Sequence, residues 1–250
     1  MLSGKAGGKR GESAHYSGRE HSRGGHASKG AEPAKHSGDA IEGPISGLEV
    51  VSALGERVCW NEKVYRPSHD TLLIVEYLER NPQLVRGKAV LDVGSGTGIV
   101  GIVAARLGAR TTVSIDIAPT AVRATLCTLR VNGVEDYHVA RCDLHTCIRE
   151  KAPFDLIVFN PPYLPLPESE CLDEESLAWC GGPNGTSVAL RFLEGLEGWC
   201  KSGSRMLLVA SSLMDFDRLL KGAGGIRLRV VGVRSFFFER IMLLEGEVSS

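Results

Sequence analysis

Hydrophobic positions along the chain follow two alternating patterns. Short apolar runs, of the length of buried strands, are separated by segments in which apolar residues recur every three or four positions, as on one face of a helix. This alternation of strand and helix patterns extends over residues 88–221. It predicts an α/β fold with a mostly parallel sheet and helices on both faces.

The pattern predicts seven strands and five helices. No helix separates the final two strand segments, so we expect the last strand to be antiparallel. Strands are predicted for 88–93, 111–118, 137–144, 154–160, 204–212, 226–235 and 239–247. Helices are predicted for 69–80, 99–108, 119–131, 186–199 and 214–221. Asn81-Pro82 ends the first helix and Pro119 begins the third.

Composition divides the chain into two parts. Residues 1–43 are mainly Gly, Ser, Lys, Arg, Glu and His, with Tyr16 as the one aromatic residue. Such a segment cannot bury enough apolar surface to offset the entropy lost on ordering, so we expect a disordered tail. Residues 44–250 have the hydrophobic content of a single folded domain.

Charge and cysteine content exclude several classes of protein. The formal net charge is −1, so no overall field favours nucleic acid or a membrane surface. The apolar runs are shorter than the roughly 20 residues that a membrane span needs. The seven cysteines form an odd set without CxxC pairs, which predicts reduced thiols in a cytoplasmic or nuclear protein. Cys142, His145 and Cys147 are close enough in sequence to suggest metal ligands, but we interpret the cysteines as buried thiols and expect no metal.

A glycine-rich turn, Gly94-Ser95-Gly96-Thr97-Gly98, follows the strand 88–93. Ligands of an open α/β sheet lie beyond the carboxyl ends of the strands, where this turn is expected. Asp116 ends the next strand and can accept hydrogen bonds from ribose hydroxyls. The spacing is G-x-G-x-G rather than the dinucleotide pattern G-x-G-x-x-G, and Asp92 would repel a pyrophosphate. This set favours S-adenosylmethionine over a nicotinamide dinucleotide, while a capping role for Asp92 is the alternative.

Asp143 and Leu144 lie at the end of the third strand of the alternating region. They are expected in the same layer as the glycine turn. In that place the Asp143 carboxylate can accept the amino group of adenine, and Leu144 can pack on the ring.

The strand 154–160 ends in Asn160-Pro161-Pro162-Tyr163. We expect this strand near the centre of the sheet. Asn160 offers a side-chain acceptor oxygen and Pro161 a backbone carbonyl, and proline restricts the backbone. Two such acceptors can bind both hydrogens of a planar NH2 group, while Tyr163 packs against its flat face. The turn indicates methylation of an amide or an exocyclic amine; an ordinary proline-rich loop is the alternative.

Together these motifs resemble those of class I S-adenosylmethionine-dependent methyltransferases of the HemK type. They match best the eukaryotic and archaeal branch, which methylates the glutamine of the GGQ motif in class I translation release factors. The resemblance implies a Rossmann-like fold and extends from about Val64 to Leu244. The matching segments are VYRPSHDT (64–71), VLDVGSGTGIV (90–100), SIDIAP (114–119), CDL (142–144), FDLIVFNPPYLP (154–165) and AWCGGPNGTSVALRF (178–192).

The resemblance also implies roles for particular residues. Asn160, Pro161 and Tyr163 would form the catalytic turn, with Asn160 contacting both substrate and cofactor. His69 stands where this branch usually has glutamate, although Asp70 and Thr71 are kept. The cofactor would be bound by Thr71, Asp92, Gly94, Gly96, Asp116, Asp143, Leu144 and Asn160.

Partners are implied in the same way. This branch commonly works with a small zinc-binding activator protein that pairs with an exposed strand, and residues 137–142 would supply that strand. The substrate would be a class I release factor, with neither a membrane nor nucleic acid as a direct partner. Two alternatives stay open. One is an N-methyltransferase for adenine or guanine amines of DNA or RNA, and the other is a catalytically silent cofactor-binding subunit.

Overall fold

The computed structural model describes residues 45–150, 152–194, 196–224 and 226–248. The expected disordered tail, residues 1–43, lies outside them. Among the described helices, none has both the length and the apolar character to cross a membrane. The α-helices are α1 (His69–Arg80), α2 (Ile99–Arg106), α3 (Pro119–Val131), α4 (Ser187–Leu193), α5 (Leu196–Trp199) and α6 (Phe216–Gly222).

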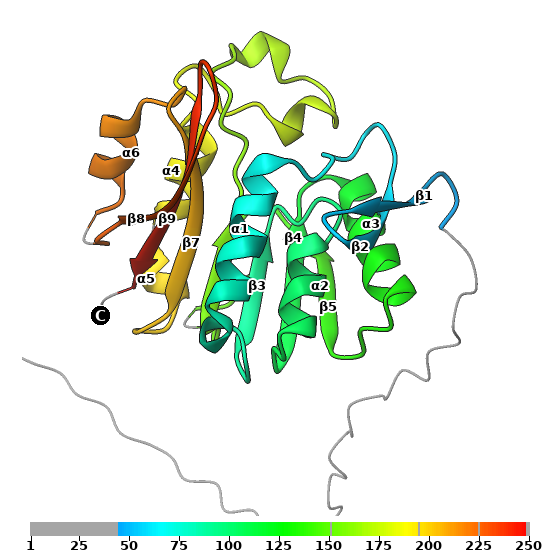
Figure 1. Cartoon of the computed structure of the whole chain (residues 1–250). Helices are drawn as coiled ribbons and strands as arrows, with labels where there is room; N and C mark the ends of the chain where they lie inside the picture. The colour runs from blue at the N-terminus through cyan, green and yellow to red at the C-terminus, as the bar shows by residue number, and fades with distance from the viewer. Residues whose placement is uncertain (1–44, 151, 195, 225, 249–250) are drawn as a thin grey trace, which may run out of the picture. The chain divides into compact units, whose positions relative to one another are not determined.

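A seven-stranded sheet forms the centre of the fold, in the order β5-β4-β3-β6-β7-β9-β8 (Figure 1). Its strands are β3 (Ala89–Val93), β4 (Thr111–Asp116), β5 (Tyr137–Arg141), β6 (Leu156–Phe159), β7 (Arg205–Ser211), β8 (Arg229–Ser235) and β9 (Arg240–Glu247). The strands from β5 to β7 are parallel, and β9 is antiparallel to both neighbours. The predicted α/β architecture and antiparallel last strand are confirmed. β6 lies centrally and β5 at one edge, as expected.

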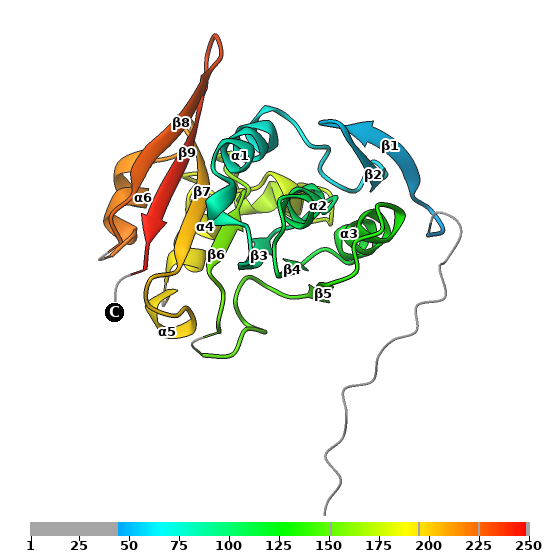
Figure 2. The ribbon, with the colours of Figure 1, turned by 60° about the horizontal axis from the view of Figure 1, so that its bottom comes forward.

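Helices cover both faces of this sheet (Figure 2), which explains why β6, the strand at its centre, is apolar at every position. Successive residues of a strand point to opposite faces. Val90 packs in the cluster that contains the buried residues of α1 and α2, whereas Leu91 packs in the cluster that contains those of α4 and α6. The carboxyl ends of the parallel strands are therefore left free to form a site.

A two-stranded hairpin, which the sequence pattern did not reveal, precedes the sheet. β1 (Glu49–Ala53) pairs antiparallel with β2 (Glu56–Trp60). Both turn residues, Leu54 and Gly55, have positive φ, as the tight turns of hairpins require. The hairpin packs on α3, where the Cys59 N–H donates to the Thr128 hydroxyl at 2.8 Å.

The single helix predicted for 186–199 is wrong, because the structure has two short helices there, α4 and α5. Glu194, which follows α4, has an extended backbone with ψ of 122°. This bend redirects the chain, and Leu196 at the start of α5 is buried. Apolar spacing alone could not show the bend, because both helices contribute buried residues to the same cluster.

The expectation of reduced thiols is wrong for most of the cysteines. The structure joins Cys59 to Cys127, Cys142 to Cys147 and Cys171 to Cys180. The Cα atoms of each pair are 5.8 or 5.9 Å apart, within the usual range for a disulfide. Cys200 is free, and burial raises the pKa of its thiol to about 12. Within the described residues no group of three His, Cys, Asp or Glu side chains is placed to bind a metal ion.

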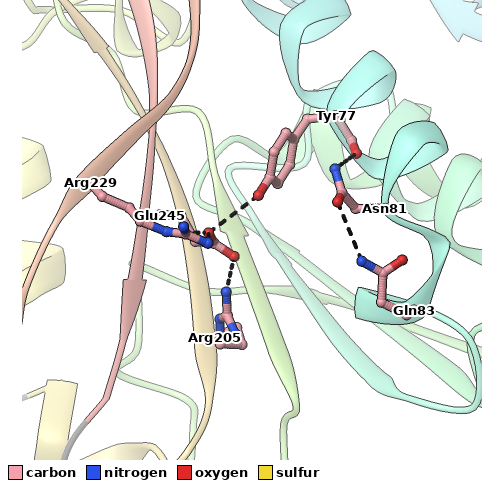
Figure 3. A network of polar contacts seen from close by, with 6 residues as sticks. All are labelled: Tyr77, Asn81, Gln83, Arg205, Arg229 and Glu245. Atoms are coloured by element: carbon pink, nitrogen blue, oxygen red, sulfur yellow. Dashed lines mark hydrogen bonds and ion pairs between the residues drawn. The ribbon is translucent and has the colours of Figure 1, made fainter.

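A buried carboxylate links three elements of the fold (Figure 3). Glu245 of β9 is 1% exposed and accepts hydrogen bonds from Arg205 of β7 and Arg229 of β8. The Tyr77 hydroxyl of α1 donates to the same carboxylate at 3.2 Å. Burial, and then the charge of Glu245, raises the pKa of Tyr77, so its hydroxyl stays a neutral donor.

We expect Glu245→Gln to lower the free energy of unfolding by about 2 kcal/mol, because an amide replaces a carboxylate that accepts charge-assisted hydrogen bonds. Urea denaturation measures this change. Glu247→Gln, at the exposed end of the same strand, is the control and should change stability by less than about 0.5 kcal/mol. Equal effects of the two substitutions would show that this network does not stabilise the fold.

Candidate active site

One cavity of about 500 Å³ lies where the parallel strands end, a volume within the range of small-molecule sites. It brings together residues from α1, from the ends of β3, β4, β5 and β6, and from the segment that follows β6. All the residues that the sequence predicted for the site line it: Thr71, Asp92, Gly94, Gly96, Asp116, Asp143, Leu144, Asn160, Pro161 and Tyr163.

The glycine turn follows β3 and enters α2. A side chain at Gly94, where φ is +62°, would approach the Phe159 ring to 3.3 Å. A side chain at Gly98 would lie 3.0 Å from the Thr125 Cα atom of α3. Glycine therefore lets the turn lie close against both β6 and α3, and leaves the space above it to the cavity.

Asp116, the last residue of β4, is held from both sides by backbone donors. The N–H groups of Gly96 and Ala118 donate to its two oxygens at 2.9 Å each. Burial raises the pKa of Asp116, and these hydrogen bonds oppose the rise. The carboxylate is thereby fixed at the cavity wall, where each oxygen keeps a lone pair for a further donor.

Asp92 is buried in β3 at the start of the glycine turn. A hydrogen bond from the Gly101 N–H, in the first turn of α2, favours its ionised form. One oxygen of Asp92 therefore caps this helix, which agrees with the alternative considered for this residue. The other oxygen, Oδ2, is buried and accepts no hydrogen bond from the described residues. Burial, and then the charge of Asp116, raises the pKa of Asp92 well above its usual range. An oxygen in this state is a site for a cationic ligand, because a positive charge would offset the cost of its burial.

Asn160 follows β6 directly and has its side-chain amide fixed in one orientation. Its Nδ2 donates to Asp70 Oδ2 at 3.0 Å. Its Oδ1 is buried and accepts no hydrogen bond from the described residues. The Tyr163 hydroxyl also donates to Asp70 Oδ2, at 3.3 Å, and burial raises the pKa of Tyr163 above its usual range. The turn thus presents an acceptor oxygen beside an aromatic ring.

Asp143 and Leu144 follow β5 and line the cavity on the side of β4. Leu144 is buried and has a φ of +50°. The Asp143 carboxylate is partly exposed and pairs with Arg191 of α4 at 2.7 Å. Arg191 was not among the predicted site residues, and only its position in the cavity wall identifies it.

A glycine-rich segment, residues 179–185, packs against the Asn160–Tyr163 turn. The Leu164 N–H donates to the Trp179 carbonyl, and the Gly181 N–H donates to the Leu164 carbonyl, both at 2.9 Å. A side chain at Gly185 would lie 2.4 Å from the Tyr163 carbonyl oxygen. The glycine at this position therefore permits the turn to lie where it does.

We expect Gly185→Ala to lower the activity of this site by more than tenfold, because the added methyl group must displace the Tyr163 backbone and misplace the turn. Gly203→Ala is the control, since Gly203 also has positive φ but no atom within 4 Å of the added carbon. A steady-state assay on both variants separates the steric contact from backbone strain. Equal losses would show that the contact with Tyr163 is unimportant.

A Rossmann-like sheet with this glycine turn, the two buried aspartates and the NPPY turn at its carboxyl ends defines a class I methyltransferase. The family model "Ribosomal protein L11 methyltransferase (PrmA)" matches residues 68–161. MJ0928 of Methanocaldococcus jannaschii, whose given name proposes protein N5-glutamine methyltransferase activity, is 33% identical over 79% of this chain and 98% of its own length. The chain belongs to this protein N5-glutamine methyltransferase family.

Two further matches are also methyltransferases. Mouse methyltransferase HEMK2 is 38% identical over 52% of this chain and 63% of its own length. Among solved structures, the Encephalitozoon cuniculi Mtq2–Trm112 complex matches with a TM-score of 0.56 and 25% identity, covering 75% of this chain and 99% of the matched one. That complex is described as responsible for methylation of the translation termination factor eRF1.

Proposed function

We propose that this protein uses S-adenosylmethionine to methylate the side-chain nitrogen of the glutamine in the GGQ motif of a class I release factor. The observation that carries the proposal is the buried Oδ1 of Asn160, which accepts no hydrogen bond from any described residue and lies in the cavity at the end of β6. An acceptor oxygen in this place suits a substrate that brings an N–H donor.

The residues present fit the cofactor. Asp92 Oδ2 would receive the ammonium group of its amino-acid part, with the backbone of Gly94 and Gly96 and the Thr71 side chain around that part. Asp116 would accept the ribose hydroxyls, and Asp143 and Leu144 would lie at the adenine. When bound, S-adenosylmethionine supplies a methyl group activated by a positively charged sulfur. It carries no phosphate, which agrees with a cavity wall rich in carboxylates.

The catalytic turn would act mainly by positioning. Asn160 Oδ1 and the Pro161 carbonyl would accept the two hydrogens of the glutamine NH2 group and so fix the direction of the nitrogen lone pair. Both contacts strengthen as positive charge develops on the nitrogen, so they favour the transition state over the ground state. The proton that the nitrogen finally loses can leave to solvent, so no side-chain base is required.

The charge of the cavity supports a protein substrate over the nucleobase alternative. Only Lys63 and Arg191 among its lining residues are cationic. A nucleic acid would bring phosphates close to this acidic wall, against Coulomb repulsion. Nearby, the tip of the β8–β9 hairpin exposes Phe237 and Phe238 beside the cavity-lining Glu239, as an apolar contact surface for a protein would. The acidic lining residues are Asp70, Asp92, Asp116, Asp143, Glu174 and Glu239.

A transfer assay with labelled S-adenosylmethionine tests the proposal. The chain, co-expressed with its candidate activator, is incubated with a class I release factor, with the variant whose GGQ glutamine is alanine, and with duplex DNA. Label on the release factor that is lost in the alanine variant would support the proposal. Label on DNA alone would favour the nucleobase alternative, and cofactor binding without any transfer would favour a silent subunit.

The activator belongs to the same proposal. Strand β5 is an edge of the sheet. The Asp136 carbonyl and the Cys142 N–H bond to β4, so the alternate residues of β5, Val139 among them, direct their backbone groups to the free edge. A small zinc-binding partner that adds a strand here would use these groups. The likeness to Mtq2, whose solved structure is a complex with Trm112, supports a partner subunit for this chain.

We expect Val139→Pro to weaken binding of the activator by more than tenfold, because it removes an outward backbone donor from the edge strand. Val139→Thr keeps the donor and the β-branched shape, and it should bind within about threefold of the unchanged chain. Calorimetric titration with the purified activator measures both. Similar binding by the two variants would show that the activator does not use this edge.

A further inference from the structure

Asp70 occupies an unusual place for a carboxylate in the first turn of a helix. It is the second residue of α1 and is 2% exposed. Its Oδ1 accepts hydrogen bonds from the next residue alone, from the Thr71 N–H at 2.6 Å and the Thr71 hydroxyl at 3.2 Å, among the described residues. Its Oδ2 is used differently, because it accepts hydrogen bonds from three side chains outside α1.

Those three donors come from two separate segments. The Tyr65 hydroxyl precedes α1 and lies 2.8 Å from Oδ2. Asn160 Nδ2 and the Tyr163 hydroxyl belong to the turn after β6 and lie 3.0 and 3.3 Å away. One carboxylate oxygen therefore holds both polar side chains of the Asn160–Tyr163 turn.

This contact decides which way the Asn160 amide points. An ionised carboxylate can only accept hydrogen bonds, so it must face the NH2 end of the amide. A reversed amide would put Asn160 Oδ1 against Asp70 Oδ2, two acceptors without a hydrogen between them. The orientation seen instead leaves Oδ1 at the cavity without a hydrogen bond from the residues that the structure describes. The charge of Asp70 also polarises the amide and makes Oδ1 a better acceptor.

We propose that Asp70 is a positioning residue of the methyltransferase, which fixes the Asn160 amide and the Tyr163 ring for the substrate nitrogen. The inference rests on the proposed function, and it adds a residue that acts through the catalytic turn. Asp70 itself need not touch the substrate.

Asp70→Asn tests this, because asparagine keeps the shape but can donate as well as accept. We expect kcat to fall by about 100-fold, the usual cost of misplacing a catalytic group by about 1 Å. The calorimetric Kd for S-adenosylmethionine should change by less than about threefold. Asp217→Asn is the matched control: it also removes a first-turn acid, in α6, and it should leave kcat within about twofold.

A double-mutant cycle separates positioning from a structural role. If Asp70 acts through Asn160, adding Asp70→Asn to Asn160→Ala should lower kcat by less than about threefold further. The inference would be overturned if the loss of kcat in the double mutant were the product of the two single losses. It would also be overturned if Asp70→Asn kept its activity within about threefold of the unchanged chain. Either result leaves the proposed function intact if the unchanged chain methylates the release factor.

A second readout needs no methyl transfer. The NMR signals of the Asn160 side-chain NH2 group are identified by their loss in Asn160→Ala. They should move upfield in Asp70→Asn, because the hydrogen bond to a charged acceptor is lost, and should not move in Asp217→Asn. Unchanged signals in Asp70→Asn would overturn the inference even if the proposed substrate were wrong.

Discussion

Asn160→Ala is expected to lower kcat by roughly 10²- to 10³-fold, the usual effect of removing one preorganised contact to developing charge. The physical reason is that the buried Oδ1 of this turn accepts no hydrogen bond from any described residue. It is therefore available to the substrate nitrogen. Cofactor affinity should weaken by less than about tenfold, because Asp92 and Asp116 remain. Steady-state kinetics with the release factor, together with calorimetry of the cofactor, separates the two effects.

Asn61→Ala is the control for this substitution. Asn61 is a surface asparagine that donates to the Gly47 carbonyl, far along the chain from the catalytic turn. Its loss should leave kcat within about twofold. If Asn160→Ala also keeps kcat within about tenfold, the turn does not bind the substrate nitrogen as proposed.

Asp92→Asn is expected to have two opposite effects. Cofactor affinity should fall about 100-fold, the equivalent of roughly 3 kcal/mol, because a buried charge no longer meets the cationic part of the ligand. The cofactor-free protein, in contrast, should become more stable at neutral pH. A buried carboxylate is costly when one of its oxygens accepts no hydrogen bond, as is seen for Asp92 Oδ2 among the described residues, and an amide removes that charge.

The raised pKa of Asp92 determines how the free energy of unfolding depends on pH. Above the ordinary pKa of aspartate, 3.8, the unfolded chain loses this proton while the folded chain keeps it up to the raised pKa. The free energy of unfolding therefore falls as pH rises through that window. The gain in Tm from Asp92→Asn should be present at pH 8 and absent below pH 3.8.

Thermal melts of the unchanged chain and of Asp92→Asn, with and without S-adenosylmethionine, measure these effects. The cofactor should raise the Tm of the unchanged chain and raise that of Asp92→Asn much less. Asp217→Asn should behave as the unchanged chain in every condition. A lower Tm for cofactor-free Asp92→Asn, or an undiminished shift with cofactor, would show that Asp92 is a structural residue.

The sequence predicted much of this fold because its signals are local. The helix predicted for 69–80 has the bounds of α1, and the strand predicted for 88–93 differs from β3 by one residue. The site residues were predictable for a related reason. They lie at strand ends or in the first helix, and a parallel sheet brings all its carboxyl ends to one edge.

The remaining features depend on contacts between distant residues. Asp70 and Asn160 are separated by 90 positions, and nothing near either one shows that they form a hydrogen bond. Cys59 and Cys127 are 68 positions apart, so cysteine counting could not pair them. The β1–β2 hairpin lacks the Asn-Gly or Asp-Gly turn that would have marked it and uses Leu54-Gly55 instead.

The most direct test is a crystal structure of the protein with S-adenosylhomocysteine, the product of methyl donation, and a peptide that contains the GGQ glutamine. We predict that the glutamine NH2 group donates to Asn160 Oδ1 and to the Pro161 carbonyl, with its flat face against Tyr163. A peptide whose glutamine lies outside the cavity, or whose amide leaves Asn160 Oδ1 without a hydrogen bond, would contradict it.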